Sequence, residues 1–200
     1  MLRLHYAPRT ISVAVAIVLE ETGTAYDAVR LDFATAEQAQ EDYRRINPKG
    51  RVPALETPDG ILTETGALLE FVAPSLVPND PYAAAKMREL MCYLNGTMHP
   101  HHAHGLRGER WADQDSSFAD MKQKVPERMA DCCTYLEEHL PALPFPIGQM
   151  QVLSDAYLYV VLTWLKGDGV EIEDHPLLAR FQHQMNGHRS IQAVYEKGML

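Results

Sequence analysis

The segment NPKGRVPALETPDGILTET, residues 47–65, predicts a strand, a tight turn, a second strand and the start of a helix. Val52-Pro53 lies where the first strand should donate hydrogen bonds and is followed by Ala54 and Leu55, and Thr57-Pro58-Asp59-Gly60 supplies the turn residues. Proline has no N–H to give to a neighbouring strand, so it normally marks an edge, a bulge or a cis peptide bond. The segment therefore predicts an antiparallel hairpin with free backbone near Val52, suited to pairing with an extended peptide.

The residues around this hairpin divide the chain into two kinds of structure. Alternating apolar residues predict strands at 2–6 and 26–32, and helical apolar spacing predicts helices at 11–21, 36–45 and 65–73. With the hairpin, the order of elements is β-α-β-α-β-β-α. Gly23 is expected to end the helix at 11–21. After prolines 74, 78 and 81 only helical patterns follow, at about 82–98, 118–140, 155–165, 176–185 and 191–196. We expect an α/β domain over residues 1–78 and an all-helical domain over residues 83–200.

The amino-acid composition argues against several classes of binding partner and location. The net charge of −9 argues against nucleic acid and anionic membrane surfaces as partners. No apolar run approaches the roughly 20 residues of a membrane span, and the first residues do not form a signal peptide. Cys92, Cys132 and Cys133 form no CxxC pair, so we expect reduced thiols, no zinc site and a cytoplasmic protein.

Four segments, in this order, resemble those of bacterial cytosolic glutathione S-transferases over essentially the whole chain. They are NPKGRVPAL (47–55), LTETGALLEFVA (62–73), GQMQVLSDAYLYVVLTWL (148–165), which enters a core helix through a buried Asp155, and HRSIQAVYEKGML (188–200). The resemblance implies a thioredoxin-like first domain, a helical-bundle second domain, glutathione as co-substrate, a homodimer, and hydrophobic electrophiles such as aromatic chlorides as second substrates.

The resemblance also implies how glutathione binds. Its cysteinyl unit would pair with the backbone of Val52 beside Pro53, and Arg51 belongs to the same binding segment. Glu64 would face the γ-glutamyl ammonium group, while the Thr65 hydroxyl and the first N–H groups of its helix would hold the γ-glutamyl carboxylate.

The thiol of glutathione must ionise before it can attack, and a hydroxyl after the first strand could stabilise the thiolate. Tyr6, Thr10 and Ser12 are the candidates, and the sequence does not rank one above the others. Ile11 stands where the similar beta class has a cysteine, so only its backbone N–H can contribute. A mechanism that uses a protein cysteine at this position is therefore not expected.

The segment MHPHHAHGLRGERW, residues 98–111, is rich in histidine but lacks the i,i+4 pair of HExxH zinc sites. Pro100 is expected to disrupt a helix there. We therefore expect no metal. The resemblance implies instead that His99, His102, Arg107 and Trp111 line the pocket of the electrophile.

Three functions remain open. The first is a glutathione S-transferase that ionises glutathione for attack on hydrophobic electrophiles. The second is a glutathione-dependent reductase of disulfides or peroxides. The third is a non-catalytic protein of the same fold that binds partners.

Overall fold

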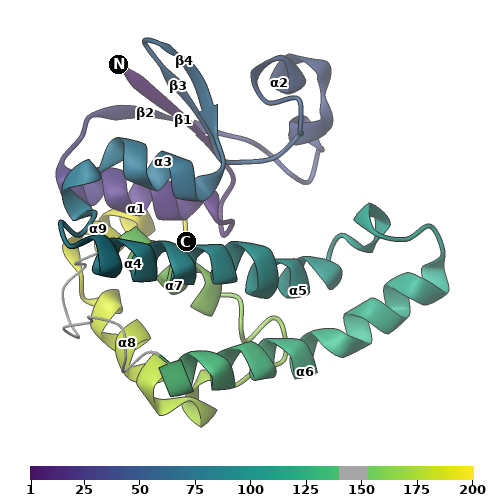
Figure 1. Ribbon diagram of the computed structural model, residues 1–200. Helices are drawn as coiled ribbons and strands as arrows, with labels where there is room; N and C mark the ends of the chain where they lie inside the picture. Colours follow the sequence, from purple (N-terminus) through teal and green to yellow (C-terminus); the bar gives the residue numbers. More distant parts are fainter. Residues whose placement is uncertain (140–152) are drawn as a thin grey trace.

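The structure, a computed structural model, describes residues 1–139 and 153–200. Its strands are β1 (Leu2–Tyr6), β2 (Tyr26–Arg30), β3 (Ala54–Thr57) and β4 (Gly60–Thr63). They form a sheet in the order β2-β1-β3-β4, seen at the top of Figure 1. β1 pairs in parallel with β2 and antiparallel with β3, and β3 pairs antiparallel with β4. This mixed sheet confirms the thioredoxin-like arrangement expected for the first half.

The helices of this half are α1 (Ser12–Thr22), α2 (Glu41–Ile46) and α3 (Thr65–Val72). Residues 12–19 of α1 are all buried, because α1 packs against α3 on one side and against helices from the end of the chain on the other. Gly23 ends α1 as predicted: it takes a left-handed φ of 66°, and the next N–H, of Thr24, bonds to the Leu19 carbonyl at 3.0 Å. At the other end of α1, residues 7–11 separate its start from the end of β1.

The predicted hairpin is present. Ala54 lies opposite Thr63 and Thr57 opposite Gly60, which places the turn at Pro58 and Asp59. The Val52-Pro53 peptide bond is cis, one of the three arrangements expected from the sequence. β3 has a neighbour on each side, so the backbone left free is that of residue 52, before the strand begins.

The second half is helical, as predicted. Its helices are α4 (Pro81–Tyr93), α5 (His99–His104), α6 (Asp115–His139), α7 (Leu153–Leu162), α8 (Pro176–Asn186) and α9 (Arg189–Glu196). Short 3₁₀ turns lie in the two halves at Glu37–Ala39, Pro74–Leu76, Gly108–Arg110 and Ile172–Asp174. All ten residues of α7 are buried, including Asp155 in its first turn. In Figure 1, α4 and α5 run beneath α1 and α3 as one long rod.

The expected helix break at Pro100 is wrong. A π-helical turn, Leu94–Met98, joins α4 directly to α5, and His99 N–H bonds to the Leu94 carbonyl across five residues. Proline lacks the N–H of a regular helical bond and its ring crowds the carbonyl four residues before it. The wider π turn just before Pro100 changes that bonding pattern, so the helix continues. As a result α4 and α5 run on as one continuous helix.

One apolar core runs through both halves, from Leu4 and Leu55 of the sheet to Leu158 of α7. The division into domains at residues 1–78 and 83–200 stays a prediction. The expected end of a helix at Leu140 lies outside the described residues. Within the described residues, no helix has the length and apolar character to cross a membrane.

Candidate active site

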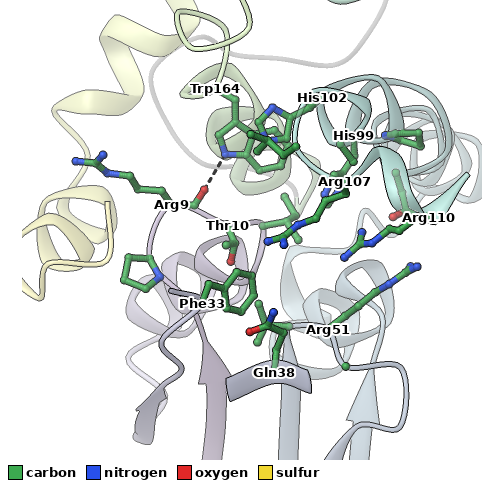
Figure 2. Close-up of a pocket in the computed structure, with 18 of the residues that line it drawn as sticks. Arg9, Thr10, Phe33, Gln38, Arg51, His99, His102, Arg107, Arg110 and Trp164 are labelled. Atoms are coloured by element: carbon green, nitrogen blue, oxygen red, sulfur yellow. Dashed lines mark hydrogen bonds between the residues drawn. The ribbon is translucent and has the colours of Figure 1, made fainter. Parts of the chain in front are cut away.

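A cavity of about 390 Å³ lies where the loop after β1 meets α5. Its floor is formed by residues 8–11 and 50–52 of the first half. Its roof is formed by side chains of residues 95–111 and by Trp164, which follows α7. Figure 2 shows these side chains converging from the two halves. The cavity is therefore a joint product of the sheet half and the helical half.

The three candidate hydroxyls lie at different depths. Thr10 lines the cavity, whereas Ser12 is fully buried behind it and Tyr6 belongs to the apolar core. Thr10 Oγ1 lies 2.6 Å from Ser12 Oγ, which accepts the Ala7 N–H at 3.1 Å. Thr10 Oγ1 also donates to the Ala7 carbonyl at 2.8 Å. Because Ser12 can donate to Thr10, the proton of Thr10 is the one free to turn from Ala7 toward a ligand.

The backbone beside Thr10 is held from the far end of the chain. Arg9 has a left-handed φ of 58°, an unfavourable conformation for a residue with a Cβ. Its carbonyl accepts the Trp164 indole N–H at 2.9 Å, the dashed line in Figure 2, and its N–H bonds to the Met199 carbonyl at 2.9 Å. These two bonds fix the loop that presents Thr10 and the N-terminus of α1.

Ile11 lines the cavity directly before α1. Its backbone N–H has no hydrogen-bond acceptor among the described residues. The following helix adds the positive end of its dipole at this point. Ile11 thus has a backbone donor without an acceptor in the described part of the chain, although its side chain is apolar.

The segment before β3 is braced from behind. The Arg51 carbonyl accepts bonds from the Tyr43 hydroxyl at 2.7 Å and from the Asn47 side-chain amide at 2.6 Å. Arg51 and Val52 line the cavity, while the cis residue Pro53 is buried beneath them. In the described part of the chain, the N–H and C=O of Val52 have no backbone partner, so both are available to an extended ligand.

Glu64 lines a neighbouring hollow of about 650 Å³ together with residues of α3 and α4, whereas Thr65 is not part of its lining. Glu64 has a φ of 71°, and its carboxylate contacts Lys49 Nζ at 2.5 Å, a pairing that the sequence reading missed. Thr65 is the buried first residue of α3. Asn95 lines both this hollow and the main cavity, so the two adjoin.

Two of the histidines of α5 are fixed by partners of different kinds. His102 Nδ1 lies 2.8–2.9 Å from both carboxylate oxygens of Asp168, and its ring stacks on Trp164 at 4.2 Å between centroids. In neutral His102 this carboxylate keeps the proton on Nδ1 and leaves Nε2 as an acceptor. Both His102 and Trp164 line the cavity, so Asp168 orients a wall of it from outside.

His99 also lines the cavity, 3.4 Å from the Tyr157 hydroxyl, which in turn donates to Asn95 at 3.3 Å. Burial, together with the charges of His102, Arg110 and Arg51, lowers the pKa of His99 from 6.5 to about 4. His99 is therefore uncharged at neutral pH and can donate or accept a hydrogen bond without adding charge.

Arg107 and Trp111, which were proposed from the sequence, line the cavity. Phe33, Gln38, Arg110 and Trp164 also line it but were not among the residues proposed from the sequence. Phe33 and Gln38 follow β2 in a stretch without regular apolar spacing, and no local signal marks them. The residues that the structure describes include no group of three or more histidine, cysteine or acidic residues able to hold a metal ion.

Comparison with known proteins identifies the family. The profile of the glutathione S-transferase N-terminal domain matches residues 3–74. A glutathione transferase homolog from Sulfitobacter, solved with bound glutathione, is 53% identical, covers 100% of this chain and 99% of its own, and superposes with a TM-score of 0.96.

Two other relatives are more distant. Glutathione S-transferase GstA of Escherichia coli O157:H7 is 28% identical over 96% of both chains. A beta class glutathione S-transferase from Sphingomonas chungbukensis is 26% identical, with a TM-score of 0.83, over 99% of this chain and 100% of that one. The full-length match at 53% identity shows that the chain belongs to the glutathione S-transferase family.

Proposed function

We propose that this glutathione transferase binds glutathione in extended form across the two adjoining hollows and ionises its thiol beside Thr10. The cysteinyl unit pairs with the backbone of Val52, next to Pro53 and Arg51. The γ-glutamyl end extends to Thr65 and Glu64. The relative from Sulfitobacter with bound glutathione supports glutathione as the ligand.

The observation that carries the mechanism is the depth of the three hydroxyls. Thr10 lines the cavity, while Ser12 is fully buried behind it and Tyr6 lies in the core. A free thiol has a pKa of about 8.5, so only a few per cent is ionised at neutral pH. Hydrogen bonds from the Thr10 hydroxyl and the Ile11 N–H favour the thiolate and lower that pKa.

The thiolate then attacks a small hydrophobic electrophile held by the roof of the cavity. With an aromatic chloride, the sulfur electron pair forms a carbon–sulfur bond, chloride leaves with its bonding pair, and the thiol proton passes to solvent. His99, His102 and Trp111 supply the aromatic walls against which an aromatic ring packs. Arg107 lies over the ring of Phe33, with its Cζ 5.4 Å from the centroid.

The test is retention on immobilised glutathione, followed by conjugation of 1-chloro-2,4-dinitrobenzene and by a disulfide-reduction assay on the same preparation. We expect retention and conjugation. Reduction without conjugation would favour the glutathione-dependent reductase, which the absence of a cysteine at residue 11 also permits. Retention without either activity would favour a non-catalytic protein, and no retention would contradict glutathione binding.

Two further features belong to the same proposal. The protein is a homodimer in the cytoplasm, with residues 1–78 holding glutathione and residues 83–200 shaping the electrophile pocket. Phe71 on α3 and Tyr82 on α4 expose 46% and 75% of their surface and suit a contact between subunits. Light scattering that gives the mass of one chain would contradict the dimer.

A further inference from the structure

Four arginines line the main cavity. The Arg9 side chain points away from the cavity in Figure 2, and the other three are Arg51 before β3, Arg107 after α5, and Arg110 in the 3₁₀ turn that follows. Figure 2 shows their side chains reaching into the same space from opposite walls. Burial and the positive charges of Arg51 and Arg107 lower the pKa of Arg110, which places the three groups in one another's electric field. The cavity is therefore strongly positive, although the chain as a whole carries a net charge of −9.

None of these three guanidinium groups forms an ion pair within the described residues, and the remaining residues, 140–152, include no aspartate or glutamate. Glu109 raises the pKa of Arg110 but lies beyond ion-pair distance. Arg88, by contrast, pairs with Glu70 at 2.6 Å, although Arg30, Arg44, Arg180 and Arg189 likewise form no ion pair within the described residues. In a chain with 27 acidic and 18 basic residues, three unpaired arginines around one cavity indicate an anionic ligand.

Glutathione alone does not account for the three charges. Of its two carboxylates, the γ-glutamyl one lies at Thr65 in the proposed binding mode, which leaves the glycyl carboxylate for the main cavity. Arg51, on the segment that pairs with the peptide, is placed to bind it. The thiolate is met by Thr10 and the Ile11 N–H. Arg107 and Arg110, which come from the helical half, then remain without an anionic partner.

Apolar surface lies next to these two charges. Arg107 lies over the face of Phe33, while Leu106 and the half-exposed Trp111 line the same wall. A guanidinium beside aromatic rings suits a flat ligand that carries a carboxylate, because the ring packs on the apolar wall while the carboxylate takes the bidentate donor.

We propose, building on the proposed function, that the second substrate of this enzyme is a carboxylate-bearing aromatic electrophile whose carboxylate binds Arg107 and Arg110. The reaction itself is unchanged: the glutathione sulfur bonds to the ring carbon, the leaving group departs with its electron pair, and the carboxylate is not altered.

The test compares two substrates that share a leaving group and differ in charge, 4-chloro-3,5-dinitrobenzoate and its methyl ester. The readout is the ratio of kcat/KM for the acid to that for the ester, so a general loss of activity in a variant cancels. We expect the acid to be preferred by the wild type. A hydrogen-bonded charge pair changes affinity by roughly ten- to a hundredfold, so Arg110→Gln and Arg107→Gln should each lower the ratio by about tenfold or more. Arg180→Gln, which removes an exposed arginine of α8 away from the cavity, should leave it unchanged.

Binding gives a readout that needs no turnover. The chain contains two tryptophans, and both Trp111 and Trp164 line the cavity, so their fluorescence reports its occupancy. Unreactive 3,5-dinitrobenzoate should quench this fluorescence at lower concentration than its methyl ester. This difference in affinity between acid and ester should shrink in Arg110→Gln and as the salt concentration is raised.

The outcomes separate the two proposals. If the ester is conjugated as well as the acid, and the arginine variants keep the wild-type ratio, the inference is wrong and the transferase proposal stands. If neither compound is conjugated but the acid binds with arginine dependence, the anion site stands and the transferase proposal fails. If neither compound reacts and the acid binds no better than the ester, both fail.

Discussion

Replacement of Thr10 by valine tests how the protein ionises glutathione. The substitution removes the hydroxyl that lines the cavity while keeping a branched side chain of similar size. Ser12 stays buried behind the site and Tyr6 stays in the core, so neither can reach a ligand in its place. The Ile11 N–H and the α1 dipole remain, so the site should lose one donor and keep its shape.

A hydrogen bond to a charged acceptor is worth about 1.5–3 kcal/mol. Since one pKa unit corresponds to about 1.4 kcal/mol, loss of the Thr10 donor should raise the pKa of the bound thiol by about 1–2 units. Below that pKa the rate of conjugation should then fall about ten- to a hundredfold, and it should recover at higher pH as the thiol ionises unaided.

The pKa is measured from the ultraviolet absorbance of the thiolate in the enzyme–glutathione complex, titrated with pH, alongside the pH profile of conjugation. Thr22→Val is the matched control, because its hydroxyl bonds to the Val18 carbonyl at the far end of the same helix. An unchanged thiol pKa in Thr10→Val, with glutathione still bound, would refute the role given to this hydroxyl.

Three other substitutions test the frame of the site. Trp164→Phe removes the bond to the Arg9 carbonyl and should cost about 1 kcal/mol in urea unfolding and raise the thiol pKa; no change in either would show that the bond does not hold the loop. His99 has a pKa of about 4 in the folded protein, below its pKa in the unfolded chain, so the unfolded state binds the proton first as pH falls. The free energy of unfolding of the wild type should therefore fall by roughly 2–3 kcal/mol between about pH 6.5 and about pH 4. His99→Phe should lose less over that range, and an equal loss in urea unfolding would contradict the neutral state of His99. Gly50→Ala should destabilise the protein by about 1–3 kcal/mol, because Gly50 has a φ of 61° and a Cβ there would lie 2.9 Å from the Gln38 carbonyl; an unchanged urea midpoint would contradict this strain.

The sequence was sufficient to predict those elements of the fold that depend on a few neighbouring residues. Turn residues between two apolar runs predicted the hairpin of β3 and β4, and Gly23 predicted the end of α1. These predictions succeed because a turn type or a helix end depends on the conformation of a few neighbouring residues. Pro100 shows the limit of such reasoning, since the π turn before it absorbs the disruption.

Contacts between distant residues could not be predicted in the same way. Trp164 and Arg9 are 155 residues apart, and His102 and Asp168 are 66 apart. Such pairs meet only after α7 packs against α1 and α4, and no spacing in the sequence encodes that meeting. The candidates Tyr6, Thr10 and Ser12 were equivalent in sequence for a related reason: they differ in depth, which depends on the packing of the whole molecule.

The most direct measurement is a crystal structure of this protein with glutathione. We predict that the cysteinyl backbone pairs with Val52 and that the sulfur lies within hydrogen-bonding distance of Thr10 Oγ1 and the Ile11 N–H. A sulfur that contacts His99 or His102 and neither of these donors, or glutathione bound away from Val52, would contradict this prediction.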